Sequence, residues 1–289
     1  MENDPQREKL DSRGSAPERS GEPSARDHPQ EVPLKAYETI LAQQVAQAEK
    51  EMERPARELL ISGFAAGIEI GFGPFLMALI LTSTRGIYAD PTVELLQAVA
   101  YSVGFIIVIL GRSELFTEHT ALAIQPVLAG RAPVAGLLRL WALVYVSNIS
   151  GAAAFAAFAA WIGPELGEAQ SWAFVEIASK YVDHPWWLLL IGGILAGWLM
   201  GLLAWLVTAA RDTIGQIVLI GLVTVGIALA HLQHSIAGTV EVLAGVLSGD
   251  QVTWAEFGQF LLWSTVGNAV GGVVFVALLK YGHVRRGGE

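Results

Sequence analysis

Six long apolar stretches alternate with short polar segments along most of the chain. Each stretch exceeds the roughly 20 residues that a helix needs to cross the hydrocarbon core of a bilayer. With 53% hydrophobic residues and nine Trp in 289 residues, this pattern predicts an all-α membrane protein with six transmembrane helices. The stretches cover residues 59–82, 93–129, 134–162, 186–210, 214–247 and 255–281.

The second and fifth stretches are too long for one crossing, and each is interrupted by polar residues near its middle. Irregular backbone at membrane depth is tolerated only where it is buried in protein or lines a cavity. We therefore expect transmembrane helices two and five to be broken. The interrupting residues are Arg112, Glu114, Glu118 and His119 in the second stretch, and His231, Gln233 and His234 in the fifth.

An internal repeat relates the first three stretches to the last three. Glycines recur every fourth position at 63, 67 and 71 and again at 193, 197 and 201, and Asn148 and Asn268 lie in the third and sixth stretches. Small-residue stripes alone occur at any close helix contact. Stripes, asparagines and interruptions in the same order predict an inverted 3+3 repeat, whose paired broken helices mark a substrate path.

The N-terminal segment differs from the rest in composition. Residues 1–33 are rich in Pro, Ser, Gly and charge, which predicts a disordered tail. Residues 34–58 are expected to form an amphipathic helix, on the membrane surface or a neighbouring subunit, although a merely solvated helix fits as well. Residues 59–282 would form the six-span channel domain and 283–289 a short tail. The expected apolar face of the helix comprises Leu34, Tyr37, Leu41, Val45, Ala48 and Met52.

Lys and Arg are distributed unevenly between the two ends of the expected spans, and this orients the chain. With an even number of crossings both termini share one side, which carries most of the basic residues and is therefore expected to be cytoplasmic. The opposite side carries Arg85 and Lys180 among many acids. The basic residues on the cytoplasmic side are Arg54, Arg57, Arg131, Arg139, Arg211, Lys280, Arg285 and Arg286.

Several classes of function are disfavoured. The chain has no cysteine, which excludes thiol catalysis and thiolate metal sites. No basic stripe indicates a nucleic-acid partner, and no nucleophile–base pair or nucleotide-binding loop indicates an enzyme. His231 and His234 have the spacing of a metal pair, but no third ligand is evident, so neither a metal nor a cofactor is expected.

Three motifs resemble those of the formate/nitrite transporter family. They are ELFT at 114–117, HSIAG at 234–238 and VGNAVGG at 266–272, and the likeness covers about residues 55–282. KEMER before the first stretch, LFTEHT and VEVL are similar to the YfdC-like branch of that family.

The resemblance implies an aquaporin-like protomer in a homopentamer in the inner membrane of a prokaryote, each protomer with its own pore. It implies passage of small monovalent anions or their acids, such as formate, nitrite, hydrosulfide, acetate or lactate. Lys180 would draw anions into an outer vestibule, and Glu114 would bond amides of the loop that breaks helix two. The path would be lined by Leu115, Phe116, Thr117, Tyr101, Phe105, Ile227 and His234.

The chain departs from the formate channels at three positions. Gly197 and Gly238 stand where those channels have asparagine, and Gln233 stands where they have glutamate. Such changes would widen or depolarise the path. They put formate itself in doubt as the substrate, but not the fold.

The residues suggest how a weak acid would cross. An apolar constriction disfavours the charged form, so the substrate would pass as the neutral acid or receive a proton, with His234 as hydrogen-bond donor and Thr117 orienting it or the substrate. Asn148 and Asn268 would satisfy backbone groups freed by the helix breaks. A neutral-solute channel and a non-conducting, stress-related membrane protein are the alternatives.

Two further acids, Glu69 and Glu241, lie inside apolar stretches and are unlike the formate-channel pattern. An intramembrane acid is a candidate functional site by default. Pairing with Arg112 or a role at a subunit interface is favoured over a proton relay. Glu118 and His119 would be vestibule groups or simply solvated.

Overall fold

The computed structural model describes residues 34–279 and 282, and every regular element in that part of the chain is helical. The all-α class is therefore confirmed. The expected tails at 1–33 and 283–289 lie outside the described residues. The helices are α1 (Tyr37–Glu53), α2 (Ala56–Ile70), α3 (Phe72–Thr84), α4 (Asp90–Gly111), α5 (Phe116–Leu122), α6 (Ile124–Leu128), α7 (Val134–Leu166), α8 (Ser171–Val182), α9 (Trp186–Ala209), α10 (Thr213–Leu229), α11 (Ser235–Ser248), α12 (Trp254–Val270) and the π-helical turn η1 (Gly271–Leu278).

Four helical stretches within the described residues are long and apolar enough to cross a membrane by length and composition. They are Ala56–Thr84, in which α2 and α3 join through Gly71, together with α4, α7 and α9. The helices α10 and α11 are apolar but shorter, because the chain leaves the helical path between them.

Both predicted helix breaks are present, and they have the same local geometry. The helix α4 ends at Gly111 and α5 begins at Phe116, while α10 ends at Leu229 and α11 begins at Ser235. A non-glycine residue in the left-handed region ends each preceding helix: Arg112 with φ 57° and His231 with φ 47°. The same backbone bond closes each end: Ser113 N–H to Val108 C=O at 3.1 Å, and Leu232 N–H to Ile227 C=O at 3.0 Å. His231 therefore has a structural place at the end of α10.

Prolines and side-chain caps set where several helices begin. Pro lacks an N–H and has a fixed φ, so it suits a helix start, and it stands at residues 55, 133 and 185 directly before α2, α7 and α9. The helix α12 opens with a capping box, in which Thr253 and Glu256 each satisfy the other's backbone N–H.

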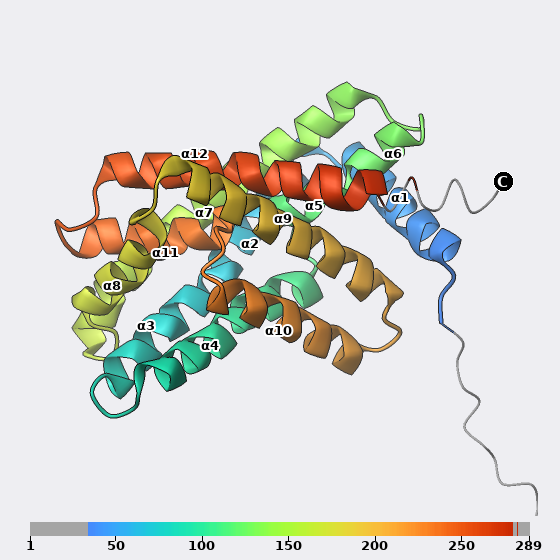
Figure 1. Ribbon diagram of the computed structural model, residues 1–289. Coiled ribbons are helices and arrows are strands. Elements are labelled where there is room, and N and C mark those ends of the chain that lie inside the picture. The colour runs from blue at the N-terminus through green and yellow to red at the C-terminus, as the bar shows by residue number, and fades with distance from the viewer. Residues whose placement is uncertain (1–33, 280–281, 283–289) are drawn as a thin grey trace, which may run out of the picture. The chain divides into compact units, whose positions relative to one another are not determined.

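Glycines allow the helices to pack at backbone contact. The helix α2 packs along α7, and α9 packs along α12 (Figure 1). A Cβ atom on Gly67 of α2 would overlap the carbonyl oxygen of Asn148, and one on Gly197 of α9 would overlap that of Asn268. The two glycine stripes predicted from the sequence therefore lie against the two asparagine helices.

The helix α1 is docked on the rest of the molecule and is not merely solvated. It contacts α5, α6, α7 and α9. Its buried side chains include the polar residues Gln44 and Glu51 beside Val45 and Ala48. Gln44 donates to Thr208 Oγ1 at 3.2 Å and accepts from Gln125 Nε2 at 2.8 Å. The buried face is thus rotated from the apolar face expected from the sequence, in which Tyr37 is in fact exposed.

The close contact at Gly197 predicts a selective loss of stability in Gly197→Ala. The added methyl group would meet the backbone of Asn268, which cannot rotate away as a side chain can, and overpacking of this kind costs about 1–3 kcal/mol or more. Gly221→Ala in α10 is the matched control, since a Cβ there meets nothing within 4 Å. Thermal unfolding of the purified protein should show a lower midpoint for Gly197→Ala only, and equal midpoints would contradict the packing described.

Candidate functional site

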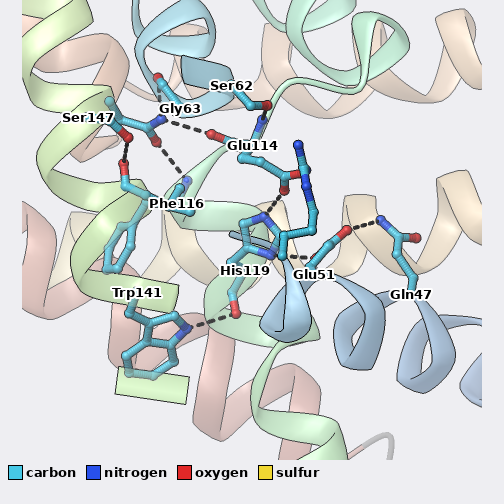
Figure 2. A network of polar contacts seen from close by, with 12 residues as sticks. Gln47, Glu51, Ser62, Gly63, Glu114, Phe116, His119, Trp141 and Ser147 are labelled. Carbon is cyan, nitrogen blue, oxygen red and sulfur yellow. Dashed lines mark hydrogen bonds and ion pairs between the residues drawn. The ribbon is translucent and has the colours of Figure 1, made fainter. Parts of the chain in front are cut away.

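Asn148 of α7 holds the first helix break in place through Gly63, Glu114 and Phe116, which are labelled in Figure 2. Its Oδ1 accepts the N–H of Phe116 at 2.8 Å, and its Nδ2 donates to the carbonyl oxygens of Gly63 and Glu114, each at 2.8 Å. Asn148 is fully buried. One side chain therefore satisfies backbone groups on both the broken segment and the neighbouring α2, as buried polar groups require.

Asn268 of α12 repeats this arrangement at the second break. Its Oδ1 accepts the N–H of Ser235 at 2.8 Å, and its Nδ2 donates to the carbonyl oxygens of Gly193 and Gln233, each at 2.8 Å. Each asparagine thus joins the residue that starts the second helical piece, the loop before it, and a glycine of the helix alongside.

The two breaks bring Thr117 and His234 together, although 117 positions separate them in the chain. Thr117 Oγ1 lies 2.8 Å from His234 Nε2, and both residues are buried. His234 Nδ1 accepts the N–H of Ala237 at 3.1 Å, which caps α11. Because Nδ1 accepts, a neutral ring carries its proton on Nε2, which then donates to Thr117 and leaves the hydroxyl proton of Thr117 for another acceptor.

Aromatic side chains of α4 stack toward this pair. The ring of Phe105 meets His234 edge-on at 5.0 Å between centroids, and Tyr101 packs on Phe105 at 5.0 Å. Leu115 and Ile227 are fully buried. Phe116 faces α7, where its ring contacts those of Tyr145 and Trp141.

A pocket of about 20 Å³ lies beside Lys180, with Gln97, Tyr181 and His231 in its lining. Lys180 Nζ is 3.3 Å from a carboxylate oxygen of Glu94, so its charge is partly balanced. Tyr181 also lies near the buried carboxyl of Glu241, one oxygen of which has no hydrogen-bond partner among the described residues.

A cavity of about 1050 Å³ opens between α1 and the first break. Its wall includes Glu51 of α1 and Glu114, Glu118 and His119 of the second apolar stretch. Burial raises the pKa of the Glu51 carboxyl above its usual range, and the Glu114 carboxylate raises it further, whereas His119 lowers it. Glu118 and His119 line this cavity, and the contact of His119 with Glu51 was not predicted from the sequence.

Two expectations about acids need correction. The carboxylate of Glu114 pairs with Arg54 and with His119 Nε2 instead of bonding loop amides, because Asn148 and Ser62 already take the backbone groups around it. Among the described residues no ion pair joins Glu69 to Arg112, and one buried oxygen of Glu69 has no hydrogen-bond partner, so the pairing is wrong and the alternative role at a subunit interface stays a prediction.

The sequence profile described as "Formate/nitrite transporter" matches residues 38–282. The chain belongs to the formate/nitrite transporter family. It is 35% identical over 240 residues to the inner membrane protein YfdC of Escherichia coli (strain K12), covering 82% of this chain and 75% of that protein.

Solved structures show that this family member has the fold of known channels. A structure described as an FNT family ion channel aligns with a TM-score of 0.77 at 23% identity, covering 85% of this chain and 99% of that one. Another, described as a pentameric formate channel with formate bound, aligns with a TM-score of 0.64 at 23% identity, covering 80% and 98%.

The packing explains two departures from the formate-channel pattern. No side chain fits at Gly197, because the backbone of Asn268 occupies the space. A Cβ on Gly238 would overlap the ring of Phe260, so this aromatic side chain fills the position beside α11.

The asparagine networks predict that Asn148→Ala and Asn268→Ala are both strongly destabilising. Each leaves a buried N–H and a buried C=O of the broken segment unpaired, at a cost of about 1–3 kcal/mol for each group, and also removes the bond to Gly63 or Gly193 of the helix alongside. Gln97→Ala is the matched control, because within the described part of the chain this buried amide has a single bond, to Met77 C=O at 3.4 Å. Thermal unfolding in detergent measures the effect. Midpoints no lower than that of Gln97→Ala would mean that the breaks are held by something else.

Proposed function

We propose that this protein conducts small monovalent weak acids, such as formic or nitrous acid and their anions, across the inner membrane. The observation that carries the proposal is the buried Thr117–His234 pair at the meeting point of two broken helices, flanked by Phe105 and Tyr101. Membership of the formate/nitrite transporter family supports it, and so does the shared fold with a channel that holds bound formate.

Lys180 would concentrate anions at one mouth, and the aromatic and aliphatic side chains would remove their water. Because dehydration of a charge in an apolar constriction is costly, the substrate crosses best as the neutral acid. The path would run past Tyr101, Phe105 and Ile227 to Thr117 and His234. Leu115 would line it from the break, and Phe116 would support the break from the α7 side.

The hydrogen bonds of His234 disfavour a transport step in which its ring takes up the proton. A second proton on the ring could enter only at Nδ1, where it would face the N–H of Ala237 and break the cap of α11. We therefore infer that the proton crosses on the substrate, and that His234 holds Thr117 so that its hydroxyl proton points to the substrate oxygen.

The proposed assembly is a homopentamer of protomers with six spans in an inverted 3+3 repeat and both termini in the cytoplasm. The matching asparagine networks support the repeat, and the Lys and Arg asymmetry supports the orientation. Exposed apolar side chains on α9, among them Trp186, Trp187 and Trp198, suit lipid or a neighbouring subunit.

A neutral-solute channel is the second candidate, and Glu241 favours it. A carboxyl group buried near Tyr101 and Tyr181 favours its neutral form, which can both donate a hydrogen bond to a neutral solute and accept one from it. Uptake into proteoliposomes of formate, nitrite, acetate, lactate, hydrosulfide and glycerol, at two pH values, distinguishes the candidates. We expect flux of the weak acids to rise as pH falls, because the neutral form becomes more abundant. Glycerol flux alone would support the neutral-solute channel, and no flux through folded protein would overturn both.

Thr117→Val tests the hydrogen bond proposed at the constriction. Valine keeps the shape but removes the donor, and a lost hydrogen bond of about 1–3 kcal/mol corresponds to a decrease in flux of about five- to 150-fold. Thr239→Val is the control, since among the described residues the hydroxyl of this buried threonine bonds only the carbonyl of Ser235 in its own helix. Equal flux in Thr117→Val and wild type would remove Thr117 from the path.

A further inference from the structure

Three buried side chains meet where α1 lies against the first helix break (Figure 2). Glu51 comes from α1, Glu114 from the loop and His119 from α5. Each offers one ligand atom, and these atoms all lie within 4.8 Å of one another. An imidazole nitrogen with carboxylate oxygens is a donor set that divalent transition metals such as Zn²⁺ accept.

The contact between Glu51 and His119 is close but is not aligned as a hydrogen bond. Glu51 Oε2 lies 3.2 Å from His119 Nδ1, and the two side chains are only 10% and 3% exposed. Even so, both atoms lack a hydrogen-bond partner among the described residues. An imidazolium that bridged two carboxylates would point its Nδ1–H along this line, and here it does not.

Two ligand atoms of one metal ion differ from a hydrogen-bonded pair, because the lone pair of each atom points at the ion and not at the other atom. With bonds of about 2.0–2.1 Å and a tetrahedral angle, two such atoms stand roughly 3.3 Å apart. The separation of Glu51 Oε2 and His119 Nδ1, together with their missing alignment, fits this arrangement.

The surroundings hold the two ligand side chains in position. His119 Nε2 lies 2.5 Å from Glu114 Oε2, which is the carboxylate–histidine arrangement that orients metal-binding imidazoles. Gln47 donates to the other oxygen of Glu51 at 2.9 Å, and Trp141 Nε1 donates to the carbonyl oxygen of His119 at 3.1 Å. Arg54 pairs with the remaining oxygen of Glu114.

We propose that His119 Nδ1 and Glu51 Oε2 bind a divalent transition-metal ion, with Glu114 orienting the imidazole. Water molecules complete the coordination of the ion. The adjoining cavity of about 1050 Å³ supplies this water and gives the ion a route to the site. The ion joins α1 to α5 and so fastens α1 at the mouth of this cavity. This site is separate from the His231–His234 pair considered in the sequence, and it does not depend on the transport proposal.

The test is calorimetric titration with Zn²⁺ of the full chain, purified without a polyhistidine tag and stripped with a chelator. Co²⁺ serves as a second probe, because its visible absorption reports tetrahedral coordination, and Mg²⁺ as the control for weak carboxylate binding. We expect one Zn²⁺ per chain. We expect Glu51→Gln and His119→Gln to abolish binding, and Glu114→Gln to weaken it about 10- to 100-fold. His184→Gln, at an exposed histidine, should bind as wild type does.

Gel filtration and thermal unfolding without metal check that each variant is folded, and Glu51→Gln keeps the test decisive if His119→Gln fails to fold. Wild-type protein with no saturable Zn²⁺ binding would overturn the proposal. So would unchanged affinity in folded Glu51→Gln, because the cluster would then be an ion-pair network alone.

Discussion

A backbone N–H or C=O inside a membrane has no water to pair with, and each of the two helix breaks in this chain frees several such groups. Asn148 and Asn268 each satisfy two of them, and their third bond ties the break to Gly63 or Gly193 of the neighbouring helix, with every distance 2.8 Å. The rest of the site depends on these bonds. They fix the positions at which α5 and α11 begin, and therefore where Thr117 and His234 stand. Without them, two half-helices with free ends would face an apolar surrounding.

The glycine contacts are part of the same constraint. An asparagine side chain can reach across to the carbonyl of Gly63 or Gly193 only if the neighbouring helices touch backbone to backbone. Gly67 and Gly197 permit that approach. In this chain Gly197 therefore has no room for a side chain, since a Cβ there would overlap the backbone of Asn268. On the proposed path, selectivity would then depend on the side chains that remain nearby, including Phe260 beside Gly238, and Tyr181 with Glu241.

The sequence was sufficient to predict the features that follow from local pattern. Polar residues inside apolar stretches located both breaks, and the paired asparagines were assigned to the freed backbone groups. The resemblance to a family predicted that Thr117 and His234 lie on one path. Side-chain partnerships across long separations were not predictable. Glu114 bonds Arg54 and His119 instead of loop amides, and α1 buries Gln44 and Glu51, because helix rotation is set by what a helix packs against. The spacing of apolar residues alone does not contain that information.

The central claim is that Thr117 lies on the transport path opposite His234, and the lack of cysteine in the chain allows a direct measurement. Thr117→Cys would place a single thiol at the constriction, and Ser264→Cys, buried in α12, would provide the control. Both are treated in proteoliposomes with methyl methanethiosulfonate, with and without formate, and flux is followed. We expect that Thr117→Cys reacts, loses its flux and is protected by formate, while Ser264→Cys keeps its flux. Full flux through Thr117→Cys after complete modification would contradict the claim.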